Sequence, residues 1–128
     1  MENGEQLIKQ NQTINITGVD TAKGIAMTGS LGIYKQLLSD FREDVEKRLP
    51  LLQTIPEAGT LPLFIIQVNS LKSDCASIGT AELAVQAAWL EAAGRAGDMV
   101  FIQENLPVFT ERITKLVVGI QAWEKAFL

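Results

Sequence analysis

Between residues 61 and 79 the chain alternates apolar and polar positions with the period of an α-helix. The apolar positions recur every three or four residues and comprise Phe64, Val68, Leu71, Cys75 and Ile78. This spacing places the side chains in one stripe along one face of a helix, where we expect them to form part of a core. Thr60 before the stretch and Gly79 after it are typical of the start and end of a helix.

A second face of the same predicted helix carries a mixture of apolar, polar and small side chains. It comprises Ile65, Ile66, Asn69, Lys72, Ser73 and Ala76. Residues three, four or seven positions apart lie on a shared helical face. This face is apolar at one end, holds an amide and an ammonium group in the middle, and ends in side chains small enough for another protein to approach closely. It is therefore the candidate binding site.

The helical period continues through the rest of the chain. Further helices are predicted from Asp20 to about Met27, from Ser30 to about Leu49, from Thr80 to about Arg95, and from Asp98 onward. Pro50 is expected to end or kink the second of these, and Pro107 to kink the last without ending it. Trp89 and Trp123 are expected to pack in the core or at a bundle end rather than to hold a ligand.

The sequence predicts an all-α protein, because no segment shows the sustained alternation of a strand. Four long helices joined by short connections favour an antiparallel up-and-down four-helix bundle with a short additional N-terminal helix. Residues 1–18 are rich in Asn, Gln, Glu and Gly and are predicted to form a flexible N-terminal tail or linker, either a frayed terminus or the end of a linker from an upstream domain. Residues 19–128 form the predicted helical bundle domain.

Composition excludes several classes of function. The 128 residues include one cysteine and no histidine, so neither a disulfide nor a typical transition-metal site is expected, and no cofactor is implied. Without histidine there is no base for serine or cysteine hydrolase chemistry. A net charge of −4 with scattered Lys and Arg argues against nucleic acid. No apolar segment approaches the ~18 residues that span a bilayer, and no leader is evident, so we expect a cytoplasmic protein without membrane insertion.

The stretch from Asn69 to Gly79 resembles the histidine phosphotransfer (HPt) domains of two-component phosphorelays. That family has a histidine followed by Leu or Ile two residues on, Lys three on, a small residue four on and Gly ten on. Leu71, Lys72, Ser73 and Gly79 stand in those places, and Ala76 is a further small residue between them. The flanking segments 18–26 and 90–98 also resemble the family, so that the resemblance covers residues 18–125.

The departure from the family falls on the residue that would carry the phosphoryl group, because Asn69 stands in the histidine position. The lone pair of an amide nitrogen is delocalised into its carbonyl, so Asn69 is not expected to accept phosphate. Ser73 is the nearest hydroxyl on that face, but no base is at hand to activate it. Cys75 lies on the core stripe, where a thiol is usually inert packing.

The resemblance implies a non-catalytic module that binds the receiver domain of a response regulator or of a hybrid histidine kinase without relaying phosphate itself. The residues expected to contact the receiver are those of the second face: Ile65, Ile66, Asn69, Lys72, Ser73 and Ala76. Lys72 would face the acidic pocket of the receiver. The protein is expected to be a monomer or a weak homodimer.

Two other functions are compatible with the same residues. The bundle could be a structural or oligomerisation domain whose exposed isoleucines pair with a second copy. Alternatively, the chain could be a competent phosphotransfer domain that carries an inactivating replacement of histidine by Asn69. A free-standing enzyme is the weakest interpretation, since no acid–base pair, metal cluster or phosphate-binding glycine loop can be assembled from these residues.

Overall fold

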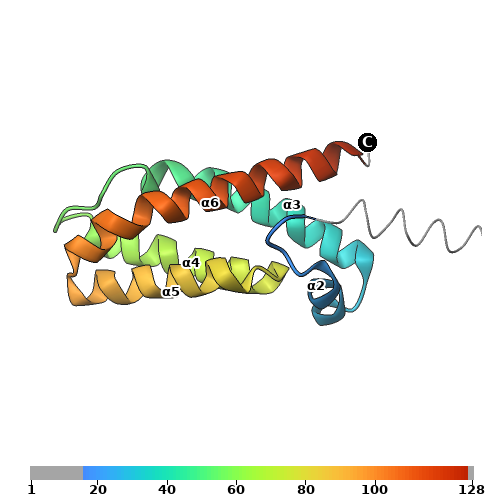
Figure 1. The fold of residues 1–128 in the computed structure, drawn as a ribbon, viewed down its shortest axis with the longest axis horizontal. Helices are drawn as coiled ribbons and strands as arrows, with labels where there is room; N and C mark the ends of the chain where they lie inside the picture. The colour runs from blue at the N-terminus through green and yellow to red at the C-terminus, as the bar shows by residue number, and fades with distance from the viewer. Residues whose placement is uncertain (1–15, 127–128) are drawn as a thin grey trace, which may run out of the picture.

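The computed structural model describes residues 16–126, and all regular structure in this range is helical (Figure 1). In chain order the elements are α2 (Thr21–Thr28), α3 (Leu31–Arg48), the 3₁₀ helix η1 (Leu49–Leu52), α4 (Leu61–Ile78), α5 (Ala81–Ala96) and α6 (Met99–Ala126). No strand occurs between residues 16 and 126, so the all-α prediction is confirmed for this part of the chain.

The four long helices pack in a ring. α3 contacts α4, α4 contacts α5 along much of its length, α5 contacts α6, and α6 returns to contact α3. Figure 1 shows these helices extending along the long axis of the molecule, with α2 at the end where α4 turns into α5. The short α2 packs against α3 and α4.

The helices begin and end close to the predicted residues. The side chain of Ser30 accepts a hydrogen bond from the Ile33 amide at 3.1 Å, which satisfies one of the free donors at the start of α3. α3 ends at Arg48, and Pro50 lies in the 3₁₀ helix η1 that follows it. Pro107 lies inside α6, which continues to Ala126, so the prediction that the last helix passes through its proline is confirmed.

The predicted apolar stripes form the core. All five stripe residues of α4 are buried, and so are the seven that mark the period of α6, namely Ile102, Leu106, Phe109, Ile113, Leu116, Ile120 and Trp123. On α3 the Tyr34 side chain is fully buried, and its hydroxyl donates a hydrogen bond of 2.7 Å to the carbonyl oxygen of Ile78 on α4. This bond satisfies the one polar atom of a buried aromatic ring.

The predicted tail at residues 1–18 falls mostly on residues 1–15, which lie outside the described part of the chain. Its last residues differ from the prediction, because Ile16 is only 4% exposed and belongs to the core. Gly119 on α6 makes room for it, since a Cβ at that position would lie 3.3 Å from Ile16 Cγ2. Burial of its apolar side chain thus fixes the chain at Ile16.

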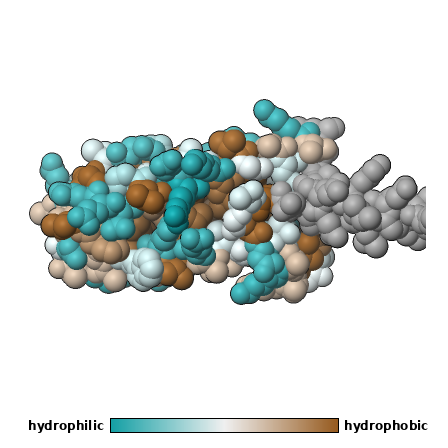
Figure 2. Space-filling model, in the orientation of Figure 1, coloured by the Kyte–Doolittle hydropathy of each residue, from teal (hydrophilic) through white to brown (hydrophobic). Residues whose placement is uncertain are grey.

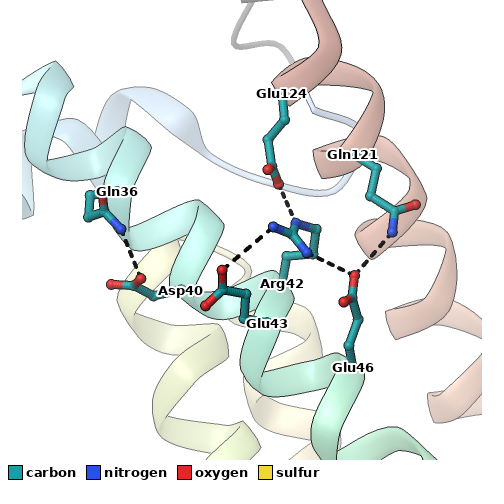
Figure 3. A network of polar contacts seen from close by, with 7 residues as sticks. All are labelled: Gln36, Asp40, Arg42, Glu43, Glu46, Gln121 and Glu124. Atoms are coloured by element: carbon teal, nitrogen blue, oxygen red, sulfur yellow. Dashed lines mark hydrogen bonds and ion pairs between the residues drawn. The ribbon is translucent and has the colours of Figure 1, made fainter. Parts of the chain in front are cut away.

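Part of the charged outer face of α3 is tied to α6 (Figure 3). Arg42 Nε donates to Glu124 Oε1 at 2.6 Å, and Arg42 Nη1 donates to Glu46 Oε1 at 3.0 Å. Gln121 Nε2 on α6 donates to the same Glu46 oxygen at 3.1 Å. These bonds link the two helices that close the ring.

The outer surface is mixed in character. The face shown in Figure 2 carries hydrophilic side chains over much of its area, with separate hydrophobic side chains between them. Within residues 16–126, none of the helices combines the length and the apolar character needed to cross a membrane.

Candidate functional site

The six predicted contact residues all lie on α4 and differ in exposure. We call the surface that they form the Asn69 surface; it comprises Ile65, Ile66, Asn69, Lys72, Ser73 and Ala76. Ile66 is 58% exposed, and Ser73 and Ala76 are exposed as well. Asn69 and Lys72 are half-buried between these two ends. The structure therefore places an accessible apolar residue at one end of this face and two small residues at the other.

Ile65 is less exposed than predicted. It is half-buried and packs against the core on the side of α4 that faces α5. The physical reason is Gly94 of α5, where a Cβ would lie 2.8 Å from Ile65 Cγ1. The missing side chain leaves a space on α5 that Ile65 fills, so Ile66 is the more accessible of the two isoleucines.

Asn69 and Lys72 are held by a residue that the sequence did not single out, Glu91 on α5. Asn69 Nδ2 donates to Glu91 Oε2 at 2.5 Å, and Lys72 Nζ donates to Glu91 Oε1 at 2.7 Å. Arg95, one turn further along α5, donates from Nη2 to Glu91 Oε2 at 3.0 Å. Glu91 is only 8% exposed, so this carboxylate is a shielded acceptor for three donors.

The three donors set the charge state of the Glu91 side chain. The Lys72 ammonium, then the Asn69 amide and the Arg95 guanidinium, lower the pKa of Glu91 to about 2. Glu91 therefore stays a carboxylate at any physiological pH. With two cations around one anion, the Asn69 surface carries an excess positive charge at its edge with α5.

The chemistry available at position 69 is limited to hydrogen bonding. The amide nitrogen already donates to Glu91, and its lone pair is delocalised into the carbonyl, so it is a very poor nucleophile toward phosphorus. Ser73 is exposed, and its carbonyl oxygen accepts a bond from the Ser77 hydroxyl at 2.9 Å. No histidine exists in the chain to activate the Ser73 hydroxyl.

Cys75 is fully buried on the core stripe, as predicted. Burial, and then the nearby Asp74 carboxyl, raise the pKa of its thiol to about 12. A thiol with so high a pKa is not a nucleophile near neutral pH. Cys75 therefore packs in the core and does not belong to the site.

A second polar cluster lies between α3 and α4 and was also not predicted. Arg48 donates to Asp44 Oδ2 at 2.8 Å and to Gln67 Oε1 at 2.7 Å. Asp74 Oδ2 is buried and accepts no hydrogen bond from an N–H or hydroxyl donor among the described residues, and the Asp44 carboxyl lies beside Asp74. Burial, and then the hydrogen bond and charge of Asp44, raise the pKa of Asp74 to about 7. Burial would also raise the pKa of Asp44, but its hydrogen bonds to Asp74 and Arg48 lower it.

Trp123 is buried, as expected, whereas Trp89 is 59% exposed, which corrects the prediction for that residue. Trp89 and Phe101 line an apolar groove between α5 and α6, with Ala92 and Ala96 beside them. The alanine-rich sequence of α5 leaves this groove shallow. No group of three or more His, Cys, Asp or Glu side chains that could hold a metal ion occurs between residues 16 and 126.

Comparison of the chain with models of protein families, with curated proteins and with solved structures finds no match. The function is therefore inferred from the geometry of α4 and α5.

Proposed function

We propose that the chain is an HPt-like signalling module that binds the receiver domain of a two-component system without accepting the phosphoryl group. The observation that carries the proposal is the α4 surface around Asn69. Ile66 is exposed at one end of it, and Ser73 and Ala76 are exposed at the other. Between these ends, the side chains of Asn69 and Lys72 are held by hydrogen bonds to Glu91. This arrangement suits a partner that packs on α4 rather than a small substrate, because the surface is open and not enclosed by other elements.

The helix order supports the fold that the resemblance implies. Consecutive long helices pack against one another and the last returns to the first. An antiparallel up-and-down four-helix bundle, with α2 as a short additional helix, accounts for these contacts. In such a bundle the α4 surface would be rigid, because α4 is supported by both α3 and α5.

Electrostatics favours an acidic partner surface. Lys72 and Arg95 are 36% and 63% exposed in their side chains, and both approach the single carboxylate of Glu91. The bond to Glu91 uses one of the three ammonium donors of Lys72 and leaves two for a partner. A cluster of carboxylates, such as the phosphorylation pocket of a receiver domain, would complement this edge.

The proposal is tested by adding a panel of receiver domains to the ¹⁵N-labelled protein and following amide resonances. We expect saturable shifts at Ile66, Asn69, Lys72, Ser73 and Ala76, and loss of binding in an Ile66→Asp variant. Ile33 on α3 is a matched control because it has the same 58% exposure, so Ile33→Asp should bind normally. A panel that shifts no α4 resonance, or an equal effect of both substitutions, would overturn the proposal.

A competent phosphotransfer domain with an inactivating replacement is favoured by one observation, the 2.5 Å bond between Asn69 and Glu91. A histidine at this position would place a ring N–H near the same carboxylate, which would orient the imidazole. The test is Asn69→His mixed with a phosphorylated receiver. Phosphoryl transfer to the variant would show that only the nucleophile is missing, whereas no transfer would reject this second candidate.

An oligomerisation domain is a candidate of a different class, favoured by the exposed apolar side chains of Trp89 and Val85 on α5. Sedimentation at several protein concentrations measures self-association directly. A receiver-binding module should be monomeric or only weakly dimeric, and Trp89→Ala should weaken any dimer. A stable dimer that Ile66→Asp abolishes would mean that a second copy occupies the α4 surface, and would favour oligomerisation over receiver binding.

A further inference from the structure

A cavity of about 300 Å³ lies away from the Asn69 surface, between the segment before α2, the start of α5 and the middle of α6. Thr17, Thr80, Glu82, Arg112 and Lys115 provide its polar groups. The volume is at the lower end of the range for small-molecule sites, which is room for a small ion with a short organic substituent.

Thr80 is the unusual member of this cavity. It is 2% exposed and occupies the N-cap position of α5, yet its side chain makes no capping hydrogen bond. Its hydroxyl makes no hydrogen bond to any other residue between 16 and 126 either. Because Thr80 lines the cavity, an acceptor bound there would satisfy this hydroxyl.

The first turn of α5 presents further donors at the same place. The amide of Ala84 is the first to enter the helical ladder, donating to the Thr80 carbonyl at 3.1 Å. The amides of Ala81, Glu82 and Leu83 precede it and have no acceptor in the described part of the chain. A threonine at the N-cap usually accepts from one of these amides, and here it does not. The positive end of the α5 dipole is therefore open.

Two cations of α6 line or border the opening, and both are held only weakly. Arg112 Nη1 lies 3.3 Å from Glu82 Oε1, and Lys115 Nζ lies 3.3 Å from Glu111 Oε1. All four side chains are substantially exposed, and pairs of this kind contribute little to stability. Arg112 and Lys115 can thus turn to a bound anion at little cost. Glu82 is the one carboxylate in the lining, and its side chain is 80% exposed.

The walls of the cavity are fixed in place before any ligand binds. The Asp20 amide donates to the carbonyl oxygen of Gly79 at 2.9 Å, which ties the segment before α2 to the turn between α4 and α5. Ile16 at the start of that segment is buried against Gly119 of α6. Preorganised donors of this kind bind an anion without a large ordering cost.

We propose that this cavity binds a phosphate group, either as inorganic phosphate or as a small phosphomonoester. The Thr80 hydroxyl and the first amides of α5 would donate to its oxygens, and Lys115 and Arg112 would neutralise its charge. The proposal does not depend on receiver binding, because no residue of the Asn69 surface takes part.

The test is a titration of the ¹⁵N-labelled protein with inorganic phosphate at constant ionic strength and pH 7. We expect saturable shifts of the Ala81, Glu82 and Leu83 amides. Thr80→Val, which replaces the hydroxyl by a methyl group of similar size, should weaken binding about tenfold, and Thr80→Ser should restore it. Lys115→Gln should weaken binding about threefold, whereas Lys125→Gln, which removes the same charge near the end of α6, should have no effect.

A parallel titration with glycerol 3-phosphate distinguishes the source of the phosphate group. Tighter binding of the ester supports an organic ligand that fills the cavity, and tighter binding of inorganic phosphate supports a site for the free ion. The proposal is overturned if the shifts do not saturate, if sodium chloride produces the same shifts, or if Thr80→Val and Lys115→Gln both bind phosphate as tightly as the original chain. Lys115→Gln keeps the test valid if Thr80→Val does not fold, because Lys115 is exposed.

Discussion

Glu91 determines the geometry of the α4 surface although it lies on α5. Its carboxylate fixes the Asn69 amide and the Lys72 ammonium, so a partner would meet these groups in one arrangement. Preorganisation of this kind lowers the entropy cost of binding. This role could not be predicted from the sequence, because a single glutamate in an alanine-rich helix has the same pattern as an exposed charge. Only the close packing of α5 on α4 identifies it.

Replacing Glu91 by Gln should destabilise the fold by about 1–3 kcal/mol, because Lys72 and Arg95 lose their shared anion in a shielded position. Chemical denaturation measures the change. Glu104→Gln, at an exposed position of α6, is the control for lost charge and should change stability by less than about 0.5 kcal/mol. Because the pKa of Glu91 is lowered to about 2, its contribution is present above its unfolded pKa of about 4.3 and is lost as pH falls toward 2. Equal stabilities of the two variants would contradict this role.

Asp74 has the opposite pH dependence. Its pKa is raised to about 7, so the folded state keeps a proton that the unfolded state has lost. The stability that this proton supplies is present below the unfolded pKa of about 3.9 and is lost as pH rises through 7. Asp74→Asn should therefore unfold at higher denaturant concentration than the original chain at pH 8. The expected gain is about 1–2 kcal/mol, because partial exposure and the lowered pKa of Asp44 reduce the effect.

The control for Asp74→Asn is Asp40→Asn, which removes the same charge from an exposed position on α3. This variant should show the pH profile of the original chain. The explanation fails if Asp74→Asn is less stable than the original chain at pH 8, or if its profile is equally steep between pH 4 and 7.

At the scale of the elements, local signals were sufficient for most boundaries. Ser30, Pro50, Gly79 and Gly97 mark helix ends in the sequence and do so in the structure. The apolar periods of α4 and α6 identified the buried faces, because a single apolar stripe on a helix must face the core. What could not be predicted is the pairing of one helix face with another. The burial of Ile65 depends on Gly94 and the exposure of Trp89 on a groove beside α6, and neither relation is local.

Gly79 illustrates how one turn connects three elements. Its φ of 93° is in the left-handed region, and a Cβ would lie 2.5 Å from the carbonyl oxygen of Asp20. Gly97 has a φ of 68° and nothing within 4 Å of a Cβ. A substitution at Gly97 therefore measures the cost of the left-handed backbone conformation alone, without a steric clash. Gly97→Ala should cost about 1 kcal/mol, and Gly79→Ala should cost at least about 2 kcal/mol because it also displaces the segment before α2. Thermal or chemical denaturation compares them, and equal losses would show that the contact with Asp20 is unimportant.

At the scale of the whole molecule, the all-helical fold presents separate surfaces. The Asn69 surface lies on α4 beside α5, the apolar groove lies between α5 and α6, and the Thr80 cavity lies at the start of α5. The first was anticipated because a short motif on one helix is local in sequence. The groove forms where the end of α5 meets the start of α6, and the cavity is assembled from three segments far apart in the chain, so both become visible only after folding.

Binding without phosphoryl transfer distinguishes the proposed module from an active relay protein and from an unrelated bundle. The most direct measurement is native mass spectrometry of the chain mixed with a phosphorylated receiver domain, followed by the mass of the separated chain. We expect a one-to-one complex that Ile66→Asp abolishes and Ile33→Asp preserves, with no phosphoryl group on the chain. A phosphoryl group on the chain, or the absence of a complex with every receiver tested, would contradict the proposal.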